Sequence, residues 1–404
     1  MHLISGTPFW PLRNGLIASY PALDASVECQ VAVLGAGITG ALVAWYLAEA
    51  GVDVVVVDKR DVVTGSTSGS TCLLQYEVDT PLHRLVKLVG EDHAVRAYRA
   101  CHSALGKIAK IDRRLGGGNG FQRTESLQGA SRAAHLPGLR REVELQRRHG
   151  FDVEWWSRAQ LTRVSTLPYP AALLARDAAQ IDAHRFSHSL LRGATAHGAR
   201  VFDRTRVTGR SSTRRGITLH TDRGLKIRAR HLVVATGYET TPYLADGLTK
   251  LMASYALVTE PSATFPGWPG NRLIWETARP YVYLRRTDDS RAIIGGYDEP
   301  TNDPRRRDAL LAAKTAALGR RFRQLLPHAP CDVAYSWCGT FAETPDGLPY
   351  IGVYGRVPHT FFALGYGGNG ITFSVIAAEI IRDFVCEGTS RDAELFRFDR
   401  PDVR

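Results

Sequence analysis

Four residues near the start of the chain carry its clearest chemical signal. Gly35, Gly37 and Gly40 have the spacing G-x-G-x-x-G, and Asp58 follows the last of them by 18 residues. In such a pattern the first glycine permits a tight turn, the second lets the backbone approach a pyrophosphate, and the third lets a helix pack closely on a strand. An acid at this distance accepts hydrogen bonds from a ribose. The spacing therefore predicts a nucleotide site.

Two strands and a helix must position these residues. VAVLG (31–35) and VDVVVVD (52–58) are apolar and β-branched, as buried parallel strands are, and ALVAWYLAEA (41–50) is typical of a helix. The aligned acid argues against the alternative, an α/β turn that binds no phosphate.

The helix N-terminus between those strands supplies further contacts. We expect the amides of Ile38 and Thr39 to bind the pyrophosphate, because the first turn of a helix has unpaired N–H groups and a partial positive charge. Lys59 follows Asp58 at the ribose, and this pair does not settle which dinucleotide binds.

A loop rich in glycine, serine and threonine follows the second strand. The segment TGSTSGSTCLLQYE (64–77) offers backbone amides and hydroxyl groups that suit a pyrophosphate and a ribityl chain. An ordinary polar turn is the alternative. The predicted cofactor contacts in it are Gly65, Ser66, Thr67, Ser68, Ser70 and Thr71.

A third segment, ARHLVVATGYET (229–240), reads as an apolar strand that ends at Thr236 and Gly237. We expect these two residues to close the adenine side of the site. The preceding residues alternate between apolar and polar types and predict a small antiparallel meander. In it, Val207 is a candidate to bind adenine through its backbone.

The segment LGYGGNGITFS (364–374) places a second glycine-rich turn before a helix that we expect to start near Ile371 or Thr372. Amides there would stabilise the negative charge that a reduced flavin accumulates at N1 and the C2 carbonyl. A plain glycine-rich helix start is the alternative. The predicted contacts are Gly367, Gly368, Asn369, Gly370, Ile371 and Thr372.

With these motifs the chain resembles the D-amino-acid oxidase superfamily of FAD-dependent oxidoreductases, which includes glycine oxidase, sarcosine oxidase and D-amino-acid dehydrogenases. The resemblance also covers WCGTFAETPDGLPYIG (337–352), and the motifs stand in the family's order over nearly the whole chain. It implies bound FAD. Some sarcosine oxidases tether the flavin to a cysteine, but Cys338 lies one position off that register. Non-covalent FAD is therefore the prediction.

The implied fold class is α/β, with a two-dinucleotide-binding, Rossmann-like FAD domain and an inserted mixed-sheet substrate domain. We predict that residues 1–80, 150–240 and 335–404 form the discontinuous FAD-binding domain. Residues 81–149 and 241–334 are then the substrate domain.

In the second substrate region, strand alternation places Tyr281, Tyr283 and Arg285 on one face. In the resembling oxidases an arginine on this sheet pairs with the substrate carboxylate, a task that suits its forked guanidinium. Arg285 is the first candidate and Arg286 the second, and a solvated surface pair is the alternative. Tyr283 and Tyr255 are candidate hydroxyl donors in the substrate pocket.

The resemblance implies oxidation of the C–N bond of a small amine or amino acid. Hydride moves to flavin N5, the resulting imine hydrolyses, and oxygen or another electron carrier reoxidises the flavin. A 2-hydroxy-acid or polyol-phosphate oxidoreductase on the same fold, a flavin-binding subunit of a larger complex, and a nicotinamide-dependent dehydrogenase stay as alternatives. The sequence leaves open whether the protein is a homo-oligomer.

Composition weighs against several other classes. The chain has 404 residues and a formal net charge of +11, but 44 of its basic residues are scattered arginines, which does not favour nucleic-acid binding. Six cysteines without a C-x-x-C pair predict no metal site and favour a reducing cytoplasm. No secretory signal is visible, and the uncharged stretch 31–48 fits a strand, turn and helix better than a membrane span.

Overall fold

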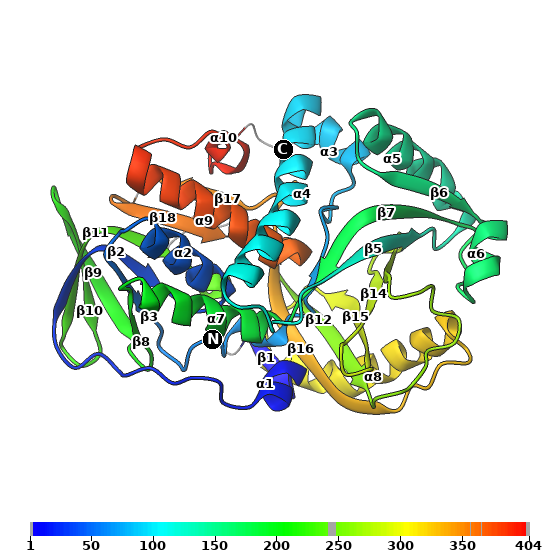
Figure 1. The fold of residues 1–404 in the computed structure, drawn as a ribbon, viewed down its shortest axis with the longest axis horizontal. Coiled ribbons are helices and arrows are strands. Elements are labelled where there is room, and N and C mark those ends of the chain that lie inside the picture. The colour runs from blue at the N-terminus through cyan, green and yellow to red at the C-terminus, as the bar shows by residue number, and fades with distance from the viewer. Residues whose placement is uncertain (1–2, 241–247, 356, 365, 401–404) are drawn as a thin grey trace.

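The computed structural model describes residues 3–240, 248–355, 357–364 and 366–400. Two sheets lie side by side in Figure 1, an eight-stranded sheet with its helices at the left and a ten-stranded sheet at the right. The architecture is α/β, as predicted.

The eight-stranded sheet runs in the order β17-β18-β11-β2-β3-β8, with β9 and β10 added beside β11. Its strands from β18 to β8 are parallel, while β17 and the β9–β10 pair are antiparallel to their neighbours. The predicted meander is therefore present. The strands are β2 (Val27–Leu34), β3 (Val54–Val57), β8 (Arg200–Phe202), β9 (Val207–Thr213), β10 (Gly216–Thr221), β11 (Lys226–Val234), β17 (Tyr350–Val353) and β18 (Thr360–Leu364).

Three helices pack with this sheet: α2 (Ile38–Glu49), α7 (Ala183–Ala196) and α9 (Gly370–Glu387). Helix α2 packs against both of the others, and its residues from Thr39 to Ala48 are buried. A helix that is apolar on every side needs such a position. The uncharged stretch 31–48 is thus a core strand followed by a core helix.

The ten-stranded sheet is mixed and runs in the order β1-β16-β12-β15-β14-β13-β5-β7-β4, with β6 beside β7. Its strands are β1 (Ile4–Gly6), β4 (Leu73–Leu74), β5 (Gln122–Gly129), β6 (Val153–Ser157), β7 (Ala171–Gln180), β12 (Lys250–Thr259), β13 (Leu273–Glu276), β14 (Val282–Arg286), β15 (Ala292–Glu299) and β16 (Val333–Glu343).

Helix α8 (Pro304–Leu325) covers one face of this sheet, against β12, β15 and β16. Asp303 is its N-cap, and its side chain accepts a hydrogen bond from the amide of Arg305 at 3.0 Å. The other helices are α1 (Phe9–Asn14), α3 (Leu82–Val89), α4 (Glu91–Arg114), α5 (Leu136–Arg148), α6 (Arg158–Val164) and α10 (Ala393–Phe396), with short 3₁₀ turns η1 (Ser66–Gly69), η2 (Ala133–His135), η3 (Gly237–Glu239) and η5 (Gly367–Asn369).

The segments that form each sheet do not coincide with the predicted domain ranges. Strands β1, β4, β6, β7 and β16 belong to the ten-stranded sheet, although they lie within the ranges expected for the FAD-binding domain. The reason is that this sheet collects short segments from the whole chain, and pairing between distant segments leaves no local signal in the sequence.

A β-bulge in β15 sets which of its side chains face α8. Between the pairs Tyr255–Gly296 and Ala253–Glu299, β15 has one residue more than β12. Gly296 has φ +130° and Tyr297 has φ +53° at this point. The extra residue reverses the alternation, so that Tyr297 packs in the α8 cluster and Asp298 lines the opposite side of the sheet.

The N-terminal arm is an ordered part of the ten-stranded sheet. Strand β1 pairs with β16, and α1 packs against η1 and α7. Its Trp10 indole donates a hydrogen bond to the carbonyl of Ser70 at 2.7 Å. Among the described residues, no helix is both long enough and apolar enough to span a bilayer.

Candidate functional site

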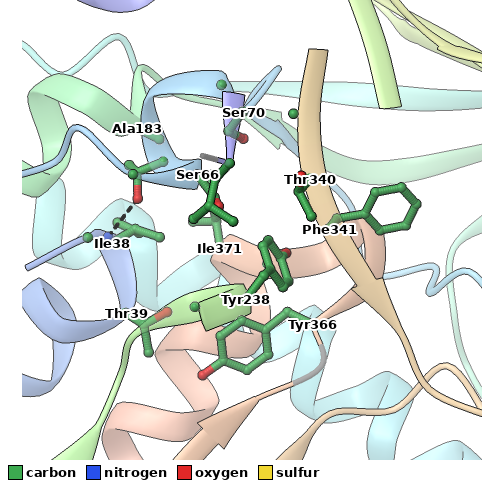
Figure 2. Close-up of a pocket in the computed structure, with 18 of the residues that line it drawn as sticks. Ile38, Thr39, Ser66, Ser70, Ala183, Tyr238, Thr340, Phe341, Tyr366 and Ile371 are labelled. Carbon is green, nitrogen blue, oxygen red and sulfur yellow. Dashed lines mark hydrogen bonds between the residues drawn. The ribbon is translucent and has the colours of Figure 1, made fainter. Parts of the chain in front are cut away.

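A cavity of about 410 Å³ lies between the two sheets, and both glycine-rich turns line it. Its volume falls in the range typical of ligand sites, ~300–1,000 Å³. Figure 2 shows Ile38 and Thr39 of α2, Ser66 of η1 and Ile371 of α9 around this space. The two turns are more than 320 residues apart in the sequence, and the fold brings them to one cavity.

Most residues predicted to contact the cofactor line this cavity. They are Gly35, Gly37, Ile38, Thr39, Asp58, Lys59, Gly65, Ser66, Thr67, Ser70, Thr71, Val207, Thr236, Gly237, Gly367, Gly368, Asn369, Gly370 and Ile371. The structure places three others behind the lining: Gly40, Ser68 and Thr372.

The first glycine turn has no room for a side chain at Gly35 or Gly40. A Cβ on Gly35 would lie 2.4 Å from the carbonyl oxygen of Ala235, and one on Gly40 would lie 1.8 Å from the carbonyl oxygen of Gly35. Gly40 therefore keeps α2 close to β2, the task expected of the third glycine. A Cβ on Gly37 would meet only the Thr67 hydroxyl, at 2.9 Å, and would stand in the cavity.

Asp58 lies at the end of β3, where it fastens the first turn. Its carboxylate accepts hydrogen bonds from the amides of Ala36, at 2.8 Å, and Arg60, at 3.0 Å. Burial raises the pKa of Asp58, and the two amides act against that rise. The carboxylate has lone pairs beyond these two bonds, as an acceptor for ribose hydroxyls needs.

The basic groups beside Asp58 are paired. Lys59 Nζ and Arg60 Nη2 contact the two carboxylate oxygens of Glu239 at 2.9 and 3.0 Å. Sequence reasoning missed Arg60 and Glu239, because the pairing joins segments that are 179 residues apart.

The loop after β3 is fixed on two sides. The amide of Ile38 donates to the Thr67 hydroxyl at 2.9 Å, which connects η1 to the N-terminus of α2. The Trp337 indole donates to the carbonyl of Gly69 at 2.8 Å. The Ser68 hydroxyl donates a hydrogen bond to the carbonyl of Gly65 at 2.9 Å. This side chain therefore stabilises the turn and does not line the cavity.

The second glycine turn is held by the segment after β4. The Asn369 side-chain amide donates to the carbonyls of Gln75 and Glu77, at 3.1 Å each. The amide of Gly368 donates to the Asp79 carboxylate at 2.7 Å. A hydrogen bond of 2.8 Å between the hydroxyls of Thr39 and Ser374 then joins the first turns of α2 and α9. Both helix N-termini are thus directed at one cavity.

The ten-stranded sheet and the segment after β4 close the other end of the cavity with aromatic, hydroxyl and acidic side chains. We call this end the substrate end. Its members are Gln75, Glu77, Asp79, Ser254, Trp275, Tyr281, Tyr283, Asp298 and Phe341. Of these, only Tyr283 was a predicted site residue.

The acids of the substrate end differ in their partners. Asp79 accepts hydrogen bonds from the Tyr281 hydroxyl, at 2.9 Å, and from Gly368. Both carboxylate oxygens of Glu77 and Oδ1 of Asp298 are fully buried, and the two carboxyl groups interact with the hydroxyls of Ser126 and Ser254, respectively. Burial raises the pKa of Glu77 to about 7 and that of Asp298 to about 7.

The structure places Arg285 outside the cavity, although it shares a face of β14 with Tyr283. The side chain is 2% exposed, and its Nη1 donates to the carbonyls of Thr71, Cys72 and Ile181 at 3.2, 2.9 and 2.9 Å. Its guanidinium lies 5.4 Å from the Trp10 ring. The N-terminal arm covers this end of the strand, so Arg285 fastens backbone and does not reach a substrate.

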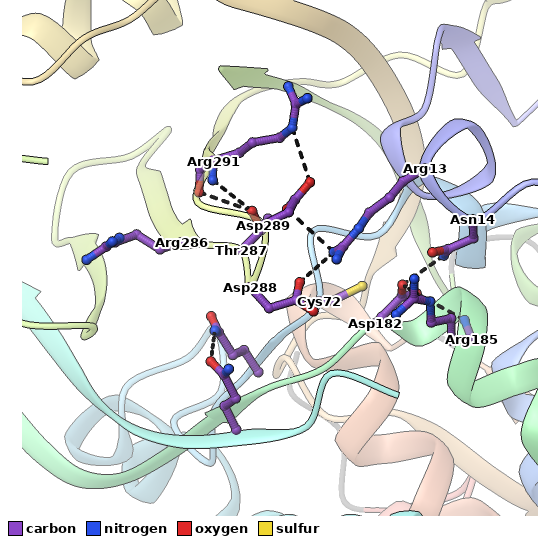
Figure 3. Close-up of polar contacts among 12 residues, drawn as sticks. Arg13, Asn14, Cys72, Asp182, Arg185, Arg286, Thr287, Asp288, Asp289 and Arg291 are labelled. Atoms are coloured by element: carbon purple, nitrogen blue, oxygen red, sulfur yellow. Dashed lines mark hydrogen bonds and ion pairs between the residues drawn. The ribbon is translucent and has the colours of Figure 1, made fainter. Parts of the chain in front are cut away.

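Arg286 does not reach the cavity either, because its guanidinium lies over the ring of Phe265 at 5.3 Å. The turn that follows β14 is fixed by the arm, since Arg13 contacts Asp288 at 2.6 Å and Asn14 contacts Asp182 at 2.8 Å. Figure 3 shows these contacts, with Arg286 directed away from them.

Tyr255 and Cys338 also lie on the far face. They pair across β12 and β16 and are buried in the hydrophobic cluster under α8. Their neighbours Ser254, Trp337 and Gly339 line the cavity instead. Successive residues of a strand face opposite sides of the sheet, so an error of one position in β12 places Tyr255 on the wrong face.

These features define a class of protein. One part of the site is a strand, a glycine turn and a helix, with an acid after the second strand. This part faces a second glycine turn, and together they form a site for an extended dinucleotide with a ring at its far end. The bare backbone at Gly35 and Gly37 fits the pyrophosphate of FAD, and the first turn of α9 fits the flavin end.

Comparison with known proteins gives the family. The chain matches the model of the DAO family, "FAD dependent oxidoreductase", over residues 30–384, and belongs to this family. It is therefore an FAD-dependent oxidoreductase.

Two curated relatives and one solved structure illustrate the likeness. The chain is 26% identical to a D-amino acid dehydrogenase of Rhizorhabdus wittichii, covering 88% of this chain and 96% of the relative. It is 25% identical to gamma-glutamylputrescine oxidoreductase of Escherichia coli, covering 94% and 88%. The crystal structure of glycine oxidase from Geobacillus kaustophilus superposes with a TM-score of 0.78 at 21% identity, covering 93% and 99%.

Proposed function

We propose that this protein oxidises the C–N bond of a small amine or amino acid. Bound FAD would supply the acceptor for the two electrons that leave as hydride from the carbon next to nitrogen, and water would convert the imine to a carbonyl compound and ammonia or an amine. The observation that carries the proposal is that one cavity holds both glycine turns and a separate polar substrate end.

The residues of the nucleotide half bind and orient. The Ile38 amide donates to Thr67, so the amides that follow it in the first turn of α2 bind the pyrophosphate, and Asp58 accepts from the ribose while it holds Ala36 in place. The amides at the start of α9 stabilise negative charge at the flavin end. None of these groups moves a proton in this proposal.

The residues of the substrate end orient the amine and exclude water. Trp275 and Phe341 supply apolar surface. Tyr283 lies 3.4 Å from the Ser254 hydroxyl, and this pair offers hydrogen bonds to the substrate nitrogen. An ammonium group must lose a proton before hydride can leave. A carboxylate with a pKa of about 7, such as Asp298, suits that transfer.

The names of the relatives agree with this chemistry. D-amino acid dehydrogenase and gamma-glutamylputrescine oxidoreductase act, by their names, on an amino acid and on an amine. The electron acceptor of this protein is dioxygen or a separate carrier, and the rate at which air restores the flavin colour distinguishes the two.

We also propose that the FAD is held without a covalent bond. Cys338, the sequence candidate for a tether, is buried beside Tyr255 on the α8 side. Cys72 lines the cavity, but its thiol contacts the carbonyl of Ser70 at 3.4 Å, and burial raises its pKa to about 11. Such a thiol is a weak nucleophile. Acid denaturation followed by filtration checks this: all the flavin is expected in the filtrate.

The function is tested by anaerobic mixing of the purified holoprotein with a panel of amines and amino acids. At least one compound is expected to bleach the flavin fully, with release of one carbonyl product per flavin. A flavin that stays oxidised with every compound, while dithionite reduces it, would contradict the proposed function.

A further inference from the structure

Three polar side chains from neighbouring strands meet at the substrate end. Tyr283 comes from β14, Asp298 from β15, and Ser254 from β12 on the other side of β15. All three line the cavity. The hydroxyls of Tyr283 and Ser254 lie 3.4 Å apart, and contacts of this kind often tighten when a substrate binds. The Ser254 hydroxyl also interacts with the carboxyl group of Asp298, whose Oδ1 is fully buried. Two hydroxyls thus connect the cavity with one carboxyl group.

The fold holds the Tyr283 ring in one place. Gly295 lies opposite Tyr283 in the register of β14 and β15, and a Cβ on Gly295 would lie 2.5 Å from that ring. The Tyr283 hydroxyl also interacts with Thr71, in the loop that was predicted to contact the cofactor. Tyr283 therefore presents its hydroxyl where the cofactor loop meets the substrate end.

Asp298 connects this position with the rim of the cavity. The charged groups that face its carboxyl group are Asp79 and Glu343, which raise its pKa, and Arg279, which lowers it. Arg279 is exposed, and so is Lys250, the cation that faces Glu343. Asp298 itself is half-buried. A proton on Asp298 is therefore close to solvent.

Glu77, the other acid with a raised pKa, has a different environment. Its hydroxyl partner is Ser126, which is fully buried and lies behind the cavity lining. Ser126 accepts hydrogen bonds from the Gln75 side chain at 2.8 Å and from the Trp275 indole at 2.9 Å. The hydroxyl beside Glu77 is thus closed to a substrate, whereas Ser254 is open to one.

We propose that Tyr283, Ser254 and Asp298 form a proton relay that deprotonates the substrate ammonium group before hydride leaves the neighbouring carbon. This inference rests on the proposed function and assigns its proton path. The substrate N–H proton passes to the Tyr283 oxygen, the Tyr283 proton to the Ser254 oxygen, and the Ser254 proton to the Asp298 carboxylate. Each hydroxyl gains and loses one proton, Asp298 becomes neutral, and no electron moves. Asp298 then releases the proton to water at the rim.

The relay gives the reaction a characteristic pH dependence. Burial raises the pKa of Asp298 to about 7, so its carboxylate accepts a proton above that pH and not below it. Without the relay, an alkylammonium group loses its proton only near its own pKa of about 10. A defect in the relay is therefore large at neutral pH and disappears at about pH 10, whereas a structural defect lowers the rate at every pH.

Stopped-flow reduction of the flavin measures this dependence. The probe is the compound of the anaerobic panel that bleaches the flavin fastest, and glycine, D-alanine and 1,4-diaminobutane are tried first. Asp298→Asn and Ser254→Ala are each expected to lower the rate at neutral pH at least about tenfold and to approach the wild type at about pH 10. Ser254→Thr keeps the hydroxyl and is expected to restore the wild-type profile. Tyr335→Phe is the control, because Tyr335 is exposed on β16.

A second readout needs no turnover. The carbonyl stretch of protonated Asp298 is followed by infrared difference spectroscopy during a pH titration of the holoprotein, and Asp298→Asn identifies the band. We expect a midpoint near pH 7 and a higher midpoint in Ser254→Ala, because the Ser254 hydroxyl stabilises the carboxylate. The FAD content and melting temperature of each variant establish that it is folded.

Failure of the relay and failure of the proposed function have different signatures. A rate that falls equally at every pH in Asp298→Asn and Ser254→Ala overturns the relay and leaves the function intact. A defect confined to neutral pH in Glu77→Gln alone does the same. An infrared midpoint that Ser254→Ala does not move overturns the relay, because the hydroxyl and the carboxyl group are then not connected. A flavin that no compound bleaches contradicts the function, and the relay falls with it.

Discussion

The two ends of the cavity treat buried charge in opposite ways. At the nucleotide end, Asp58 accepts two amide hydrogen bonds, and Lys59 and Arg60 share Glu239. At the substrate end, the carboxyl groups of Glu77 and Asp298 have only neutral hydroxyl partners, Ser126 and Ser254, and burial raises the pKa of each to about 7. Ion pairs and amide hydrogen bonds therefore fix the charges of the nucleotide end, whereas the acids of the substrate end can change protonation state near neutral pH.

The comparison also separates local from distant determinants. The nucleotide end was predicted well, because Gly35, Gly37 and Asp58 belong to one continuous strand–helix–strand unit. The second turn was predicted too, and the fold brings it to the same cavity. Each turn was predicted from residues that lie within a few positions of one another in the sequence.

The substrate end was predicted poorly for physical reasons. Alternation correctly placed Tyr283 and Arg285 on one face of β14, but the sequence does not reveal that Trp10 and the backbone at Cys72 cover the arginine. Asp298 was missed because an extra residue in β15 reverses the alternation. Gly295 and Gly296, which precede it, are the signal that a bulge leaves in a sequence.

The largest expected effect is at the first turn. In Gly37→Val the new side chain occupies the pyrophosphate position, and its Cβ would lie 2.9 Å from the Thr67 hydroxyl, which would have to shift. We expect FAD affinity to fall at least about 100-fold with the fold retained. Fluorescence titration of apoprotein with FAD measures this. Gly209→Val is the matched control, because a Cβ there meets no atom within 4 Å. Retention of stoichiometric FAD by Gly37→Val would contradict the site.

Arg285→Met tests the structural task given to this arginine. Loss of the guanidinium leaves three backbone carbonyls without that donor, so we expect a loss of about 3 kcal/mol in the free energy of unfolding. Chemical denaturation measures the loss. The Kd for the compound that bleaches the flavin in the anaerobic panel is expected to stay the same in the folded variant. A stable variant with weakened substrate binding would restore Arg285 as a substrate residue.

Glu77→Gln is expected to have a smaller effect, and one that stabilises. The folded-state pKa of Glu77 is raised to about 7 from 4.5, so the unfolded chain loses its proton first as pH rises. Wild-type stability from this group is thus full below about pH 4.5 and is lost as pH rises to about 7. Without amine, Glu77→Gln should gain about 2 kcal/mol at pH 8 and nothing at pH 4. An equal gain at both pH values would show that burial does not raise the pKa of Glu77 in the folded protein.

The central claim is that two distant backbone turns hold the two ends of one FAD molecule. It is tested most directly by titrating apoprotein with FAD and with ADP, which lacks the flavin end, in the wild type and in Gly370→Val. A Cβ on Gly370 has no protein atom closer than 3.9 Å, yet Gly370 lines the cavity at the start of α9. We predict that FAD binds the wild type at least about 100-fold more tightly than ADP, and that Gly370→Val weakens FAD binding alone. Equal affinities for FAD and ADP, or an unchanged affinity of Gly370→Val for FAD, would contradict the account.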